Sequence, residues 1–419
     1  MAQDSAARTD IRADAHTNSH AYPPPRRSAT EVPDAYAVLR AQEPVAEVTL
    51  PSGDTGHLVS RYADVRAVLA DPRCSRAATV LPEAPKLTAV PFDAGGLFTM
   101  DPPEHTRLRG LVARAFTPRR VEGMRPRIAE LAGELADSMA AAGSPTDLNA
   151  AFAFPFPVAV ICELLGVPYA DRERFRTWSD AVLSLTAHTP EEMMRHKQAL
   201  LGYLRDLVAD KRRAPGEDLL SALVAVRDEE GGAEGGLSEH ELLTLAMTLL
   251  IAGHETTVGV LGTSVFTLLR QPGRLALVPD GEEESAALVE ELLRINPIGD
   301  GGPLRVTTEP VEIAGRVLPA NSAVIASICS ANRDGARFPD ADRFVPGRAD
   351  DPTQPPHLAF GHGPHYCLGA PLARAELSIA LHVLADRFPT MRLAAPVESI
   401  TMHTGLLVNR LTELPVEWD

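Results

Sequence analysis

The longest apolar pattern in the chain lies between Ser238 and Arg270. From Leu242 to Gly253 the residues are apolar on nearly every side of a helix, which predicts a buried helix of about 33 residues and about 50 Å. Ser238 and Glu241 have the spacing of a capping box, and a proline follows the end of the pattern. The apolar stretch is too short to span a bilayer, so we expect a core helix.

Two other helices have marked starting points. One is expected from about Leu368 to Arg387, because Pro371 is tolerated only in a first helical turn. Another is expected to open with Asp101 as its N-cap, a first-turn proline and Glu104 as the third helical residue. The glycine-rich, acidic stretch 229–236 predicts an exposed loop between helices.

The domain organisation follows from the length and from the lack of linkers. A chain of 419 residues could form two or three domains, but no Ser/Gly-rich or Pro-rich stretch separates self-sufficient halves. We therefore expect one catalytic domain over residues 31–419. Residues 1–30 are polar, contain three consecutive prolines and lack the apolar continuity of a signal or membrane anchor, so we expect a flexible segment.

Charge and cysteine content exclude several classes of function. The net charge of −16 argues against nucleic acid or an anionic membrane as a partner. The four cysteines, Cys74, Cys162, Cys329 and Cys367, are too scattered for a disulfide framework, and the first three have apolar neighbours. These observations predict a cytoplasmic protein.

Candidate chemistry is densest in the stretch Phe360 to Gly369, Phe-Gly-His-Gly-Pro-His-Tyr-Cys-Leu-Gly. Cys367 ends a glycine-rich loop and directly precedes a helix, whose positive end and loop N–H groups can stabilise a thiolate. A buried structural thiol is one alternative. A zinc site formed with His357, His362 and His365 is another, but zinc sites usually pair two short ligand spacings, and no Cys-x-x-Cys occurs here.

A carboxylate and a hydroxyl interrupt the apolar helix at Glu255 and Thr256. Buried polar groups in such a setting require a functional or structural reason. Gly253 could allow a ligand to lie against the backbone. The structural alternative is that Thr256 bonds to the carbonyl four residues earlier and that Glu255 caps a kink.

Both motifs resemble those of the cytochrome P450 family. The cysteine stretch matches Phe-Gly-x-Gly-x-His-x-Cys-x-Gly at all fixed positions, and residues 252–257 match Ala/Gly-Gly-x-Asp/Glu-Thr-Thr/Ser. The resemblance implies a mainly α triangular prism with small β-sheets, in which haem lies between the long helix and the cysteine loop. It also implies a helix over Arg61–Asp71 and strands within 45–50, 57–60, 311–325 and 401–416.

The resemblance assigns haem-binding and catalytic roles by position. Cys367 would be the iron ligand of haem b, with Phe360 packed beside it and Gly361 and Gly369 in the same loop. Such thiolate ligation favours O–O bond cleavage. Thr256 would hold the outer oxygen atom or a water, and Glu255 would pass protons from solvent. The haem propionates would be bound by four basic residues: His105, Arg109, Arg305 and His365.

A Glu-x-x-Arg pair, Glu291 and Arg294, has the family's scaffold pattern. By resemblance it forms a buried network closed by a downstream arginine, for which Arg343 is the candidate. Relatives commonly have proline where this chain has Ala341. A surface ion pair is the simpler alternative.

Residues 107–127 are rich in arginine, although the chain as a whole carries a net negative charge. A solvated helical face is the usual explanation. The resemblance places this region near the cysteine ligand, where acidic iron–sulfur proteins deliver electrons, and so predicts a ferredoxin-docking face. Its members are Arg107, Arg114, Arg119 and Arg120, within a run that also includes Arg109, Arg125 and Arg127 and the single acid Glu122.

These features predict a haem-thiolate monooxygenase that inserts one atom of O2 into a bulky, largely apolar small molecule by hydroxylation or epoxidation. Electrons would come from NAD(P)H through a separate reductase and ferredoxin, because the chain has no flavin or nucleotide fingerprint. Its sequence most resembles those of actinobacterial enzymes that tailor macrolide polyketides in antibiotic biosynthesis. Two alternatives are a non-catalytic haem sensor, which needs no proton relay, and a peroxide-driven enzyme, which would lack the Glu255–Thr256 pair.

Overall fold

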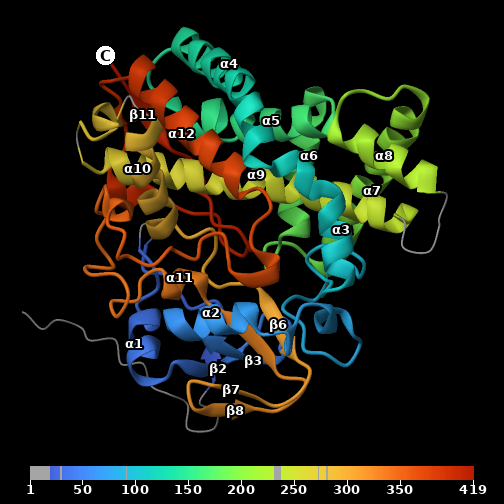
Figure 1. Ribbon diagram of the computed structural model, residues 1–419. Coiled ribbons are helices and arrows are strands. Elements are labelled where there is room, and N and C mark those ends of the chain that lie inside the picture. The colour runs from blue at the N-terminus through green and yellow to red at the C-terminus, as the bar shows by residue number, and fades with distance from the viewer. Residues whose placement is uncertain (1–18, 29–30, 91, 231–236, 272, 280–281) are drawn as a thin grey trace, which may run out of the picture.

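The computed structural model describes residues 19–28, 31–90, 92–230, 237–271, 273–279 and 282–419. Most helices gather in one half of the molecule and most strands in the other (Figure 1). The helices are α1 (Ala35–Gln42), α2 (Tyr62–Ala70), α3 (Glu104–Ala113), α4 (Pro118–Ala142), α5 (Pro155–Leu165), α6 (Arg172–Val182), α7 (Pro190–Arg213), α8 (Leu219–Glu230), α9 (Glu239–Leu269), α10 (Glu282–Ile295), α11 (Ile328–Ala331) and α12 (Ala370–Arg387).

Helix α9 crosses the helical half of the molecule between α5 and α12 (Figure 1). The predicted capping box is confirmed: the Ser238 side chain accepts from the Glu241 N–H, and the Glu241 side chain accepts from the Ser238 N–H. By length and composition α9 could cross a membrane, but 78% of its most apolar window is buried inside the protein. The apolar pattern therefore serves core packing on all sides, as expected.

The main sheet contains six strands in the order β1-β2-β3-β9-β6-β4. Its central strand β9 pairs in parallel with β3 and antiparallel with β6, with Val324 opposite both His57 and Arg305. Strands were expected in the regions of β3 and β9 but not in that of β6. The strands are β1 (His20–Ala21), β2 (Val45–Thr49), β3 (Thr55–Val59), β4 (Cys74–Ser75), β5 (Thr146–Asp147), β6 (Leu304–Thr307), β7 (Val311–Ile313), β8 (Arg316–Leu318), β9 (Ala323–Ala326), β10 (Arg392–Leu393) and β11 (Pro415–Glu417).

The N-terminal segment differs from its prediction. Residues 1–18, 29 and 30 lie outside the described residues, but residues 19–28 are not a free end. His20 and Ala21 extend the main sheet as β1, and Tyr22 is buried. Flexibility was inferred from local polarity and prolines, and the partners that hold this segment are distant in sequence.

The expected loop over 229–236 falls largely on residues outside the described part, since only 229 and 230 are described. The predicted start of α3 is also wrong. The helix begins at Glu104, and the Asp101 carboxylate instead accepts hydrogen bonds from the Ser75 hydroxyl and from the N–H groups of Arg76 and Ala77. Asp101 therefore joins the segment before α3 to β4.

The Glu291–Arg294 pair is buried, as the resemblance implies, but its third member is Arg348 rather than Arg343. Arg294 Nε lies 2.7 Å from Glu291 Oε2, and Arg348 Nε lies 3.2 Å from the same oxygen. Only the main-chain carbonyl of Arg343 accepts from Arg294, and its side chain is 76% exposed beside Asp340. The segment after α11 directs Arg343 outward and Arg348 inward.

We expect Arg348→Met to lower the free energy of unfolding by about 3 kcal/mol, because it leaves the buried Glu291 carboxylate with one cation fewer. Arg343→Met should change it by less than about 0.5 kcal/mol, the usual size of an exposed substitution. Urea denaturation of both variants measures the difference. Equal losses would contradict the assignment of Arg348.

Candidate functional site

The cysteine loop is held in a fixed shape ahead of α12. The Cys367 N–H donates to the Phe360 carbonyl at 2.8 Å, and the Arg374 guanidinium lies 4.4 Å from the centre of the Phe360 ring. Gly361 and Gly363 have φ values of +74° and +75°, which disfavour any other residue. A Cβ on Gly363 would lie 2.7 Å from the Leu69 carbonyl oxygen.

Cys367 differs from the other three cysteines because its side chain is exposed, whereas Cys74, Cys162 and Cys329 are buried. Loss of hydration beside protein atoms raises the pKa of all four thiols, Cys367 included, although its side chain keeps contact with solvent. At Cys367 this effect is opposed by the N–H groups of Gly369 and Ala370 and by the charges of Arg109 and Arg374. Arginine charges also oppose it at Cys74 and Cys329, but N–H groups do so only at Cys367. A thiolate that binds iron needs these same groups.

A cluster of basic side chains lies beside this loop with Asp101 as its acid. The rings of His105 and His365 are 4.2 Å apart, and His365 Nε2 lies 3.9 Å from Asp101. Arg305 is buried and donates to the Cys74 and Leu69 carbonyls. Burial lowers the pKa of His105 to about 4, helped by the charges of His365 and Arg109. The structure thus brings together all four residues expected to bind propionates.

Arg76 is a member of this cluster that the sequence analysis did not identify. Burial and the charge of Arg305 lower its pKa to about 9. It donates to the Phe98 and Leu304 carbonyls. No local pattern distinguishes Arg76 from a surface arginine, and only the fold places it next to Arg305.

These residues fit a haem group. The buried Nε of Arg305 and Nε2 of His365 have no hydrogen-bond partner within the described residues. Hydrogen-bond donors without a partner, in a cluster with excess positive charge, are suited to bind the two carboxylates of the haem propionates. The zinc alternative finds no support in the described ranges, which hold no group of three His, Cys, Asp or Glu residues placed for a metal.

A cavity of about 580 Å³ lies next to α9. Its wall includes Glu255 and Thr256, and Ala359 beside the cysteine loop. Five separate regions of the chain contribute to it, through residues such as Phe98, Val182, Met247, Ile298 and Met402. The lining is mostly apolar, which suits a bulky ligand.

Thr256 donates to the Ala252 carbonyl at 2.9 Å, so the local hydrogen bond expected as the structural alternative is present. Thr256 also borders the cavity. Gly253 does not serve a ligand as expected. A Cβ there would lie 2.5 Å from Ile161 Cδ1 in α5, so the glycine permits close packing of α5 and α9.

Glu255 does not cap a kink, because its carboxylate belongs to a buried ionic network. Arg410 lies 3.2 Å from Glu255 Oε2 and 2.7 Å from Asp180 Oδ2, and His254 Nε2 lies 3.2 Å from Glu255 Oε1. Burial alone would raise the pKa of Glu255, but His254, Arg410 and the nearby Arg176 keep it below its ordinary value. Arg410 lies 155 positions away along the chain, so no local pattern indicates that it is the partner of Glu255.

The family follows from comparison with known proteins. The family model described as Cytochrome P450 matches residues 44–276 and 286–410. The chain belongs to the cytochrome P450 family. It is a P450 monooxygenase, and the family implies a haem-thiolate cofactor, a small-molecule substrate, O2 and redox partners.

Two curated relatives and one solved structure are similar to this chain over most of its length. Nocardicin C N-oxygenase of Nocardia uniformis subsp. tsuyamanensis is 47% identical over 96% of this chain and 99% of the relative. Mycinamicin IV hydroxylase/epoxidase of Micromonospora griseorubida is 47% identical over 91% and 94%. The crystal structure of SgvP, from the tailoring of griseoviridin, has a TM-score of 0.90 at 46% identity and covers 96% of this chain and 100% of that one.

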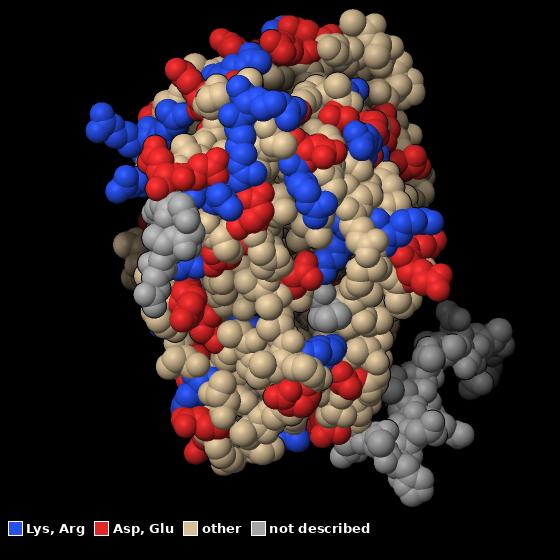
Figure 2. Space-filling model, turned by 90° about the vertical axis from the view of Figure 1, so that its right-hand side faces the viewer, with Lys and Arg blue, Asp and Glu red and all other residues tan. Residues whose placement is uncertain are grey.

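The arginine-rich segment of this P450 is only partly free. Arg114, Arg119 and Arg120 are exposed, and the last two border a groove of about 490 Å³. Arg107 differs, because it forms an ion pair with Glu241 in the first turn of α9. On the face around α3, α7 and α8, acidic and basic side chains are mixed (Figure 2). A docking face would therefore be confined to the segment from Arg114 to Arg120.

Proposed function

We propose that this P450 binds haem b through Cys367 and oxidises a bulky, largely apolar natural product, a macrolide polyketide, by hydroxylation or epoxidation in antibiotic biosynthesis. The observation that carries the proposal is the 580 Å³ cavity, whose wall holds Glu255 and Thr256 and reaches Ala359 beside the cysteine loop. A non-catalytic sensor would not need a buried carboxylate with an ionic link toward the surface.

The residues of the site have distinct roles in this proposal. Haem held by Cys367 supplies the iron at which O2 is activated. The unpartnered donors of Arg305 and His365 bind its propionates together with His105 and Arg109. Phe360, Gly361 and Gly369 shape the loop around the thiolate.

Proton delivery is assigned to Glu255 and Thr256 of α9. Thr256 borders the cavity and its hydroxyl donates to the Ala252 carbonyl, so its oxygen can accept a hydrogen bond from a water there, and it can donate to oxygen only by releasing that carbonyl. Protons reach Glu255 from the side of the network that ends at Asp180, whose side chain is 23% exposed. Water rather than Arg410 carries them, because a guanidinium cannot take up a proton. The apolar walls exclude bulk water from the reaction.

The substrate class rests on this lining and on the relatives. The macrolide enzyme that acts on mycinamicin IV is 47% identical. We propose the same class of substrate here. The test is a screen for substrate-induced spectral shifts with macrolides, including mycinamicin IV, and with nocardicin C, followed by product analysis. A shift and an oxygenated product with a macrolide are expected. A response to nocardicin C alone, or to none, would overturn the macrolide proposal.

We also propose that the electrons come from NAD(P)H through a reductase and a ferredoxin in the cytoplasm. The exposed Arg114, Arg119 and Arg120 support this, because acidic iron–sulfur proteins associate with basic patches.

Reversing charge at Arg114 and Arg120 together, to glutamate, should raise the apparent KM for ferredoxin about tenfold at low ionic strength, with kcat little changed. The difference should shrink as salt is added, since surface charges are screened. Steady-state turnover with ferredoxin as the varied component measures it. Arg343→Glu, a charge reversal at another exposed arginine outside the segment, is the control; equal effects would refute the docking face.

A further inference from the structure

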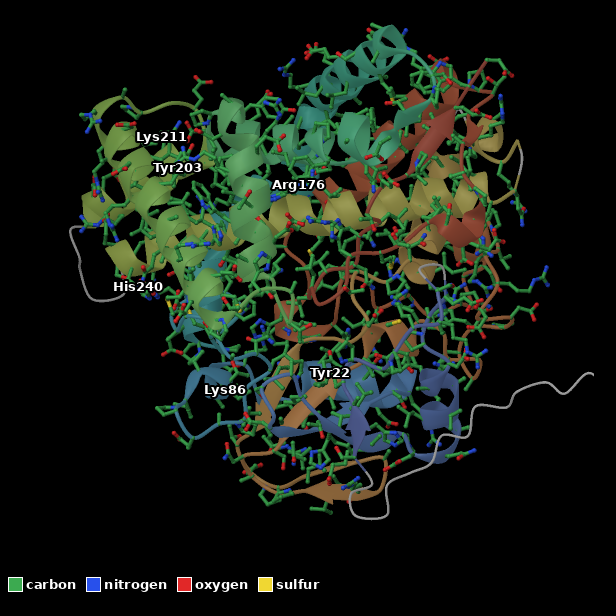
Figure 3. All side chains as sticks on the ribbon, turned by 180° about the vertical axis from the view of Figure 1, so that it is seen from behind. Tyr22, Lys86, Arg176, Tyr203, Lys211 and His240 are labelled. Atoms are coloured by element: carbon green, nitrogen blue, oxygen red, sulfur yellow. The ribbon has the colours of Figure 1, made fainter. Side chains whose placement is uncertain are left out.

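The N-terminal segment forms part of the substrate cavity. We call residues 20–26 the N-terminal strap. Its β1 residues pair in parallel with Val48 and Thr49, and the Tyr22 N–H donates to the Thr49 carbonyl at 3.1 Å. Tyr22 and the three prolines that follow it all border the cavity. Tyr22 lies near the middle of the molecule in Figure 3, well inside its outline.

The strap packs tightly on the segment between α10 and β6. Tyr22 is 6% exposed, and a Cβ on Gly301 would collide with its hydroxyl oxygen. Pro23, Pro24 and Pro25 present apolar rings and have no N–H donors, so they form a rigid apolar wall. This composition suits a surface that excludes water from a largely apolar ligand.

One ion pair holds the end of the strap. Arg26 Nε lies 2.6 Å from Asp300 Oδ1 and 2.7 Å from Oδ2, and each side chain is only 15% exposed. Asp300 also accepts from Asn409 Nδ2 at 3.1 Å, and the Asn409 N–H donates to the Ile298 carbonyl. The pair thus connects three cavity-lining segments: the strap, residues 297–304 and residues 402–409.

We propose that the strap is a specificity-determining wall of the substrate cavity and that the Arg26–Asp300 pair is the latch that keeps this wall closed. With the latch intact, the wall limits the size of ligand that enters and slows the release of a bulky one. Without it, residues 22–26 separate from residues 297–304, and the restriction on large ligands is relieved while small ligands are unaffected. The inference rests on the proposed function, since it takes this cavity as the substrate site.

Ligands of two sizes separate a latch from a mere structural anchor. Imidazole and ketoconazole both bind haem iron through an azole nitrogen and shift the absorption spectrum, so stopped-flow spectroscopy gives their association and dissociation rates. Arg26→Met should accelerate ketoconazole dissociation about tenfold, equivalent to about 1.4 kcal/mol. Imidazole rates should stay within about twofold of native values, and Arg26→Lys, which keeps the charge but not the two-pronged geometry, should lie between.

The matched control is Lys211→Met. Lys211 forms a similarly shielded ion pair with Asp218, 2.6 Å apart and 15% and 9% exposed, but it lies far from Tyr22 (Figure 3). Lys211→Met should leave the association and dissociation rates of both azoles unchanged. Equal acceleration of both azoles by Arg26→Met, or of neither, would overturn the latch.

Failure of the proposed haem site gives a different result. In that case the native protein would show no spectral shift with either azole. Hydrogen exchange then decides the latch by itself, because the Tyr22 amide is bonded to Thr49. Faster exchange of that amide in Arg26→Met, but not in Lys211→Met, supports the latch; unchanged exchange overturns it.

Discussion

Replacing Cys367 with serine is expected to abolish the strongly red-shifted Soret band of the reduced protein with CO and to reduce product formation below detection. A hydroxyl does not ionise in the protein, so the iron would lose its thiolate donor. The loop should remain folded, because the main-chain bond between Cys367 and Phe360 does not involve the sulfur. Absorption spectra of the haem-loaded variants measure the effect.

Cys162→Ala is the control, since this thiol is buried in α5 and packs as a small apolar group. It should keep the native spectrum and lose about 1 kcal/mol of stability at most. A red-shifted band that survives in Cys367→Ser would show that another residue ligates the iron.

The second large effect is expected from Glu255→Gln, which should lower the yield of product per NAD(P)H about a hundredfold. An amide fills the same space but cannot accept and release a proton. Reducing equivalents would then be lost as hydrogen peroxide. Parallel measurement of NAD(P)H, product and peroxide gives the coupling.

Two neighbouring hydroxyls give the matched control. Thr256→Ala should uncouple turnover as Glu255→Gln does, whereas Thr257→Val should not, because Thr257 is buried and does not line the cavity. Native coupling in both Glu255→Gln and Thr256→Ala would show that protons arrive by another route.

The pH dependence of the coupling tests the role of Arg410. In the native protein the pKa of Glu255 lies below its ordinary value, so the carboxylate stays charged down to acidic pH, and its stabilising contribution is lost only as the pH falls through that lowered pKa. Arg410→Met removes a positive charge that counteracts the effect of burial on Glu255, so the pKa of Glu255 should rise. The acid limb of the coupling profile should therefore move to higher pH; an unmoved limb would contradict the network.

Several elements could be predicted from local sequence because their cause is local. The capping box of Ser238 and Glu241, the all-round apolar pattern of α9 and the proline in the first turn of α12 each involve residues within a few positions of one another. Hydrogen bonding and side-chain packing along a helix act over this range.

Predictions that needed a distant partner were less successful. Asp101 looked like an N-cap but binds the 75–77 segment, and Arg348 rather than Arg343 completes the Glu291 network. The strap was read as a flexible end because Asp300, its ion-pair partner, lies 274 positions away. Polar side chains at a loop or chain end give no local sign of which way they will point.

The sequence by itself determined the family, the cysteine loop, the long central helix and the adjacent Glu255 and Thr256, because each is a contiguous pattern with its own local geometry. Tertiary structure alone decided how Glu255 is charged, through Arg410 and Asp180, and how the cavity is closed, through Arg26 and Asp300. Ion pairs depend on distance and burial in space, and neither is set until the helices and sheets have packed.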